Sequence, residues 1–196
     1  MDTVMVKVNG TAPLLMHNVR LANPLDEYVK AIKLITSKPK KTDADYEELF
    51  KLEHAGGLYY NEKIGPYIPG RMIRASMING ARLLKLGTAL ERTLLVKETH
   101  AKLIYDGPRE RDKLYTSGHY TDIRSVSAQG TRGGSKTMRC RPIFEDWSAE
   151  FTLSVDPTII SLDNLKQCVE RAGAYHGFGD GRSEGNGRFE IAEWGV

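Results

Sequence analysis

Several short apolar runs along the chain follow the two-residue period of a β-strand. Residues 4–8 are rich in valine, and residues 150–156 place Phe151, Leu153 and Val155 on one face. Because these runs are far apart in the sequence, we expect one sheet built from distant segments. Further strands are predicted at 93–96, 102–105 and 187–194.

Two longer segments follow the 3.6-residue period of an amphipathic helix. After a turn at Pro69 and Gly70, a helix is expected to run to about residue 86, with Ile73 and Met77 on its apolar stripe. A second helix is expected after Ser161, whose hydroxyl suits the N-cap position. Each helix lies between predicted strands.

Residues 23–57 contain two more helical patterns, which we interpret as an insertion after the first strand. Asn23 is a favourable N-cap residue, and Pro24 fits the first position of a helix. Thr42 and Asp45 have the spacing of a capping box at the start of the second helix.

Without this insertion, the order of elements is βαββαβ. That order predicts an α+β fold with a ferredoxin-like or RRM-like sheet, in a single domain that spans residues 1–196. A chain of 196 residues is long enough to bury a core of this size.

Composition excludes several classes of protein. No apolar run approaches the roughly 20 residues that cross a bilayer, and the first residues do not resemble a signal peptide. Cys140 and Cys168 are too few for a disulfide scaffold or a cysteine metal site. We therefore expect a cytoplasmic protein with neither a membrane partner nor a metal or cofactor.

The net charge of +3 is small, but the charge is unevenly distributed. Residues 124–141 contain five cations and no acidic residue, interleaved with Gly and Ser. Such a hairpin or loop is suited to a sugar-phosphate backbone, although a merely solvated loop is the alternative reading. The candidate binding residues of this basic arm are Arg124, Arg132, Lys136, Arg139 and Arg141.

A second candidate site is the glycine-rich loop at 177–188. Glycine lets backbone N–H groups approach a phosphate closely, and the two arginines add positive charge, whereas a flexible connector is the plain alternative. The candidate residues here are Gly177, Gly179, Arg182, Gly185, Gly187 and Arg188.

A third candidate is the helix start after Pro69. Arg71 and Arg74 lie in the first turn, where a cation opposes the helix dipole unless an anion is bound. Solvation of the helix surface is an equally good explanation of the two arginines.

Two of these motifs resemble a known family. The segment "GFGDGRSEGNG" matches the glycine loop near the C-terminus of the repeat-associated mysterious protein (RAMP) superfamily. The segment "YIPGRMIRASM" is similar to a Pro-Gly turn and helix in the CRISPR effector backbone subunits of that superfamily.

The resemblance implies a function as well as a fold. RAMP backbone subunits bind a guide RNA in an oligomer and carry a hairpin thumb, which the basic arm would match. It implies sequence-independent binding of single-stranded RNA or DNA, assembly of several copies along the strand, and contacts with other effector subunits. A stand-alone or phage-encoded filament protein is a variant of this hypothesis, in which Met138 is a candidate wedge between bases or a core residue.

Two other functions stay open. One is an endoribonuclease, since another RAMP branch cuts RNA with a histidine near the first helix. The other is an interaction protein that imitates a backbone subunit. The sequence gives no strong reason to expect an enzyme. Candidate catalytic residues by position are His17, His54, Asp26, Asp43 and Asp45, and His176 borders the glycine loop.

Overall fold

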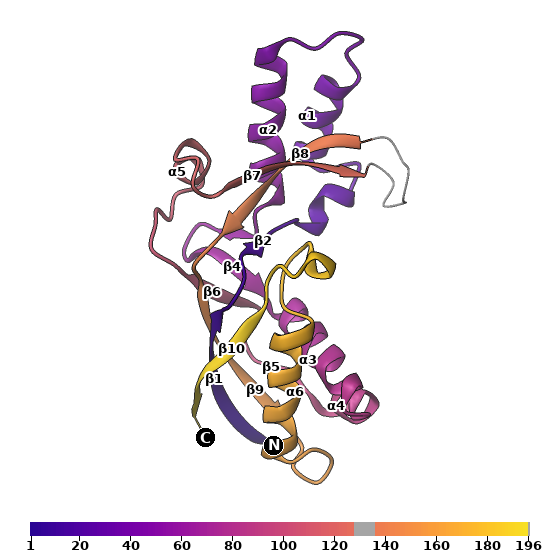
Figure 1. Ribbon diagram of the computed structural model, residues 1–196, viewed down its shortest axis with the longest axis vertical. Helices are drawn as coiled ribbons and strands as arrows, with labels where there is room; N and C mark the ends of the chain where they lie inside the picture. Colours follow the sequence, from indigo (N-terminus) through magenta and orange to yellow (C-terminus); the bar gives the residue numbers. More distant parts are fainter. Residues whose placement is uncertain (128–135, 196) are drawn as a thin grey trace. The chain divides into compact units, whose positions relative to one another are not determined.

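The structure is a computed structural model that describes residues 1–127 and 136–195 (Figure 1). It divides into two compact units. Unit 1 comprises Met1–Leu14, Tyr60–Asp106 and Phe144–Val196, and unit 2 comprises Leu15–Tyr59 and Gly107–Ile143. Whether the chain acts as a single domain with an insertion at 23–57 stays a prediction.

Unit 1 is built on an antiparallel sheet. Its core strands are β1 (Asp2–Gly10), β6 (His100–Ile104), β9 (Ser148–Val155) and β10 (Phe189–Gly195). The strand order is β10-β1-β9-β6-β4-β3, and β5 pairs with β9. The remaining strands of this sheet are β3 (Tyr60–Asn61), β4 (Gly65–Pro69) and β5 (Leu95–Val96).

The connections between the core strands confirm the predicted fold class. Helix α3 (Gly70–Leu83) lies between β1 and β6 in the chain, and α6 (Leu162–Tyr175) lies between β9 and β10. The chain order is thus β1-α3-β6-β9-α6-β10, which is the βαββαβ order of an α+β, ferredoxin-like fold. The paired strands β1 and β10 are distant in sequence, as are β1 and β9.

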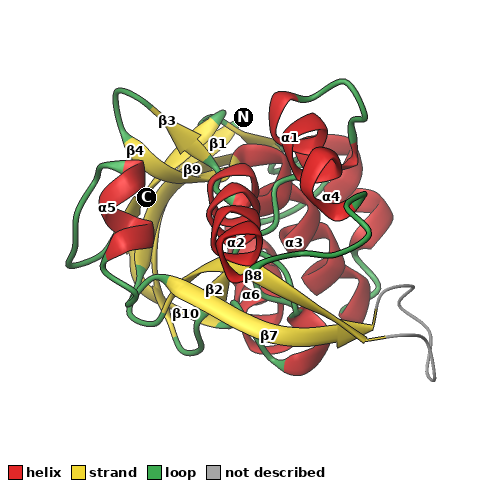
Figure 2. Ribbon diagram, turned by 90° about the horizontal axis from the view of Figure 1, so that it is seen from above, coloured by secondary structure: helices red, strands yellow, loops and turns green. Residues whose placement is uncertain are grey.

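Helices α3 and α6 cover one face of this sheet (Figure 2). Alternate residues of β1 and β9 face them, so that Val6 and its register partner Phe151 are both buried. The two helices also approach each other closely. A Cβ at Gly80 would lie 2.3 Å from the carbonyl oxygen of Cys168, so only glycine allows this distance.

Unit 2 contains helices and a hairpin. Strands β7 (Thr121–Ser127) and β8 (Lys136–Phe144) pair antiparallel. The short strand β2 (Leu14–Leu15) pairs with β8 on its other side. The basic arm is therefore a β-hairpin over its described residues. The helices of this unit are η1 (Val19–Ala22), α1 (Glu27–Thr36), α2 (Asp43–Gly57) and α5 (Arg111–Thr116).

Of the two helix starts predicted within residues 23–57, one is confirmed and one is wrong. The capping box of Thr42 and Asp45 is confirmed at α2. The expected cap at Asn23 is wrong, because its side chain accepts the N–H of Leu25 in a turn and α1 begins later, after Asp26.

The region between α3 and β7 was also misassigned in part. Helix α4 (Gly87–Thr93) occupies the start of the expected 93–96 strand, of which only Leu95–Val96 pairs. Helix α5 lies between β6 and β7, where the sequence predicts neither a helix nor a strand. None of the helices in the described part of the chain combines the length and the hydropathy needed to cross a membrane.

Candidate nucleic-acid interface

The outward face of α3 carries a row of basic side chains. Arg71, Arg74 and Arg82 follow a spacing of three and eight residues, so they lie along one side of the helix. Together with Asn79, and with Glu91 of α4, they line an open hollow of about 260 Å³, which we call the α3 hollow. The predicted residues Arg71 and Arg74 are therefore part of one site, to which the structure adds Arg82.

Neighbouring groups hold two of these arginines in position. Arg74 donates to the carbonyl oxygens of Glu91 (2.5 Å) and Leu94 (3.4 Å), near the C-terminal end of α4. Carbonyls at a helix end attract a cation, so Arg74 also links α3 to α4. Arg82 donates to Asn79 Oδ1 at 2.8 Å. Arg71 is exposed to solvent.

The glycine-rich loop is attached to the same helix. Ser76 Oγ, which is buried, donates to the carbonyl oxygen of Gly177 at 2.9 Å. The backbone N–H of Gly179 points at Met72 Sδ, 3.1 Å away. Two successive turns of α3 thus hold the loop against this helix.

Within the loop, two glycines are required by the loop's own backbone. Gly177 and Gly187 both have φ near +70°, and a Cβ on either would meet backbone atoms of the opposite arm. At Gly187 the nearest atom, the carbonyl oxygen of Phe178, would be only 1.8 Å away. The N–H of Gly187 donates to the Pro13 carbonyl at 2.7 Å. Gly185 differs, since its Cβ position is open.

Cations of α3 and of the loop act electrostatically on His176. Burial lowers the pKa of this imidazole, and the charges of Arg182, Arg188 and Arg82 lower it further. Arg188 Nη2 donates to the carbonyl oxygen of Arg182 at 3.3 Å. Its Nη1 is buried and has no hydrogen-bond partner among the described residues. The charges of these three arginines therefore all act on one imidazole.

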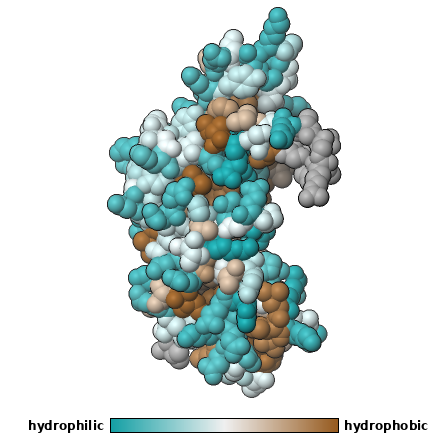
Figure 3. All heavy atoms as spheres, viewed as in Figure 1, coloured by the Kyte–Doolittle hydropathy of each residue, from teal (hydrophilic) through white to brown (hydrophobic). Residues whose placement is uncertain are grey.

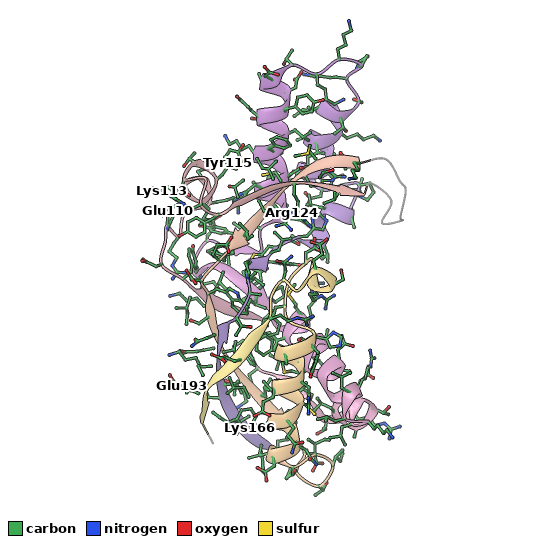
Figure 4. All side chains as sticks on the ribbon, viewed as in Figure 1. Glu110, Lys113, Tyr115, Arg124, Lys166 and Glu193 are labelled. Atoms are coloured by element: carbon green, nitrogen blue, oxygen red, sulfur yellow. The ribbon has the colours of Figure 1, made fainter. Side chains whose placement is uncertain are left out.

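Two acidic side chains offset part of the positive charge in the described part of the basic hairpin of unit 2. Asp122 lies 2.7 Å from Arg124 (Oδ1 to Nη2) and 3.6 Å from Arg141 (Oδ2 to Nη2). Arg124 is labelled on the hairpin in Figure 4. The expectation of an unopposed positive arm counted only residues 124–141 and so missed the carboxylate two residues upstream.

Arg139 has an acidic partner as well. Its Nη1 lies 2.5 Å from Oε1 of Glu53 on α2, and the other oxygen of Glu53 accepts the N–H of Cys140 at 2.9 Å. Lys136 is exposed, whereas Arg132 lies outside the described residues. Met138 is 45% exposed, which excludes the core role.

The candidate catalytic histidines differ in their surroundings. His54 lies in the last turn of α2, where the helix dipole favours a cation, but burial has the opposite effect on this imidazole. Its ring is buried, Nε2 lies 2.9 Å from the carbonyl oxygen of Tyr120, and burial lowers its pKa. A Tyr115 ring packs edge-on against it at 5.4 Å. His17 is exposed, in the segment that follows β2.

The candidate acidic residues have structural roles. Asp26 caps α1 and pairs with Arg20 at 2.8 Å. Asp45 closes the capping box, and its hydrogen bond from Lys38 lowers its pKa to about 2. Asp43 lies in the first turn of α2, where the helix dipole favours a carboxylate. Within residues 1–127 and 136–195, no group of three or more His, Cys, Asp or Glu could hold a metal ion.

Comparisons with known proteins identify the fold. No family model matches the sequence, and no curated protein matches it. Among solved structures, the chain is similar to a chain in the type III-B Cmr-beta complex bound to cognate target RNA, with a TM-score of 0.50 and 12% identity. The match covers 98% of this chain but 59% of the other, so this chain spans less than two thirds of that protein. At this identity, the likeness shows that the two chains share a fold.

Proposed function

We propose that this protein binds single-stranded RNA, without reading its sequence, on the helical side of unit 1. The observation that carries the proposal is the row of Arg71, Arg74 and Arg82 along the α3 hollow. Arg82 also acts electrostatically on His176, together with Arg182 and Arg188 of the loop. Like charges are costly to place together unless an anion is bound between them. A sugar-phosphate backbone supplies anions at regular intervals and fits such a row of cations.

The chemistry of the opposite face of the sheet supports this choice of surface. An RRM stacks bases on aromatic residues of its sheet. Here three neighbouring residues on β1, β9 and β10 are charged instead, namely Lys7, Glu150 and Glu193. Lys7 Nζ lies 3.8 Å from the carboxylate of Glu150 and 3.0 Å from that of Glu193. This charged cluster has a net negative charge and would repel phosphate. Glu193 is labelled on β10 in Figure 4.

We further propose that several copies assemble along one strand, together with other effector subunits. A solved structure with a similar fold is a chain of a complex bound to cognate target RNA, which supports this context. In this proposal, the exposed Lys136 of the β7–β8 hairpin is a further cation available to RNA. Arg124, Arg139 and Arg141 contribute less, because their charge is shared with Asp122 and Glu53.

Size-exclusion chromatography with light scattering tests the proposal. The full chain is mixed with a single strand of about 40 nucleotides, which is longer than the roughly 4–16 nucleotides that a single OB-fold domain covers. RNA and DNA strands of the same sequence are compared, with duplex RNA as the control. A particle of several protomers on RNA is expected. A monomer that ignores both single strands would refute the proposal and direct attention to protein partners.

A further inference from the structure

A second hollow lies between the last turn of α3 and the last two turns of α6. It is lined by Leu83, Leu84, Arg171, Tyr175 and His176, and it has a volume of about 400 Å³, within the range of about 300–1,000 Å³ typical of small-molecule sites. We call it the α3–α6 hollow. Two leucines, an aromatic ring and an imidazole surround it, so its lining differs from the polar α3 hollow.

The side chains at the α3–α6 hollow are unusually exposed for their type. Tyr175 is 56% exposed and Leu83 is 54% exposed. Exposed apolar groups that gather around a concave site commonly mark a place where a ligand binds. In the lower part of Figure 3, where α3, α4 and α6 lie in Figure 1, apolar side chains interrupt the hydrophilic surface.

Arg171 holds the aromatic wall in place. Its guanidinium lies over the Tyr175 ring, 5.8 Å from the ring centroid. Such a cation–ring pair restrains both side chains, and bases stack readily on tyrosine rings and on guanidinium planes. One wall of the α3–α6 hollow can therefore stack against a flat, heteroaromatic group.

The charges around this hollow indicate what the flat group is attached to. His176 lines the α3–α6 hollow, and Arg82, which lines the α3 hollow, acts on His176 together with Arg182 and Arg188. An apolar, ring-walled cavity thus adjoins a group of cations at one side. A nucleotide has the complementary arrangement, with a planar base joined to a phosphate.

We infer that the α3–α6 hollow receives a base of the bound strand, stacked on Tyr175, while the adjoining phosphates lie on Arg82, Arg182 and Arg188. This inference rests on the proposed function and specifies how the strand is held. Stacking tolerates any base, since every base has an aromatic face, so the hollow is compatible with binding that does not read sequence.

A comparison of normal and abasic strands tests the inference with the full chain. The probe is a fluorescently labelled RNA of about 12 nucleotides, within the span of one domain; a matched strand lacks its bases. The variants are Tyr175→Ala and Tyr175→Phe. The control is Tyr46→Ala, which removes an exposed tyrosine from α2.

For the normal strand, we expect Tyr175→Ala to weaken binding by about fivefold or more, the usual effect of losing one stacked base. Tyr175→Phe and Tyr46→Ala should bind like the unmodified protein. The abasic strand should bind the unmodified protein and Tyr175→Ala equally. The dependence of affinity on salt should be unchanged in Tyr175→Ala, because no phosphate contact is lost.

The outcomes separate the two proposals. If the unmodified protein binds the normal strand and Tyr175→Ala binds it equally well, the base site is wrong and the proposed function survives. An equal loss on both strands would also overturn the base site, because the effect would not depend on a base. If the unmodified protein binds neither strand at any salt concentration, the proposed function fails and the base site fails with it.

Discussion

The backbone N–H of Phe178 donates to the carbonyl oxygen of Gly187 across 2.9 Å. This bond joins the two ends of the glycine-rich loop. The exposed Arg182 lies between these two ends in the chain. Phe178 is fully buried and stacks on Phe189 with 4.4 Å between the ring centroids. The glycines at the base of the loop therefore serve its closure, and the arginines carry the charge.

Gly187→Ala should destabilise the protein strongly. The new Cβ would lie 1.8 Å from the carbonyl oxygen of Phe178, and φ of +72° is unfavourable for alanine. We expect a loss of more than about 3 kcal/mol in the free energy of unfolding, since backbone strain of 1–3 kcal/mol adds to the clash. Urea denaturation measures it.

Gly185→Ala is the matched control for this prediction. Gly185 also has a positive φ, of +96°, but no atom lies within 4 Å of its Cβ position. The loss should be limited to about 1–2 kcal/mol of backbone strain. Equal losses for the two variants would show that loop closure does not depend on the close contact at Gly187.

How much of this fold the sequence predicts depends on the range of the interactions. The strands and the helices of the βαββαβ core follow from the alternation at Phe151 to Val155 and from the stripe at Ile73 and Met77, because period and burial are local signals. The start of α1 does not follow, since Asn23 and Asp26 are both good caps and tertiary contacts such as Arg20 to Asp26 select between them.

The candidate site shows the same limit. Arg71 and Arg74 could be found because their spacing along one helix is visible in the sequence. Arg82 has that spacing too, but its proximity to His176 depends on how α3 crosses α6. The neutralisation of Arg139 by Glu53 joins residues 86 positions apart, and nothing in the local sequence indicates it.

The pair of Glu53 and Arg139 should stabilise the hairpin of unit 2. Glu53→Ala removes a buried acceptor from the N–H of Cys140 and leaves Arg139 unpaired. We expect a loss of about 1–3 kcal/mol in the free energy of unfolding. Glu53→Gln retains an oxygen that can accept the N–H of Cys140, so it should lose less. A Glu53→Ala variant as stable as the unmodified protein would refute this role.

Acid should destabilise the protein through His54. Burial lowers its pKa below the ordinary value of 6.5, so the unfolded chain binds the proton first as the pH falls. The free energy of unfolding should be fully retained above pH 6.5 and should decrease from there toward the lowered pKa. Urea denaturation at about pH 7.5 and about pH 5.5 brackets this window.

His54→Gln is the informative variant, because an amide can still donate to the carbonyl of Tyr120. Its stability should depend less on pH over the same interval. His176→Gln provides the comparison, since the other shifted imidazole is only half-buried. If His54→Gln and the unmodified protein lose stability in parallel, His54 is not the group responsible.

Binding of a single strand should raise the pKa of His176. Burial and then the charges of Arg182, Arg188 and Arg82 keep this pKa low in the free protein. A phosphate on those arginines would offset their charge and favour the imidazolium form. An NMR titration of the histidine ring protons, with and without a short RNA, measures the change. A pKa that stays the same in the saturated complex would place the phosphates elsewhere.

The most direct test of the account is the salt dependence of RNA binding, measured by fluorescence anisotropy. Replacing Arg82, Arg182 and Arg188 together with alanine should weaken binding and reduce the slope of log K against log salt by about 2, or about 0.7 for each phosphate contact. Lys166→Ala removes a cation from helix α6 of the same unit, outside both hollows, and should change the slope little (Figure 4). If the triple variant kept both the affinity and the slope of the unmodified protein, the proposed interface on unit 1 would be wrong.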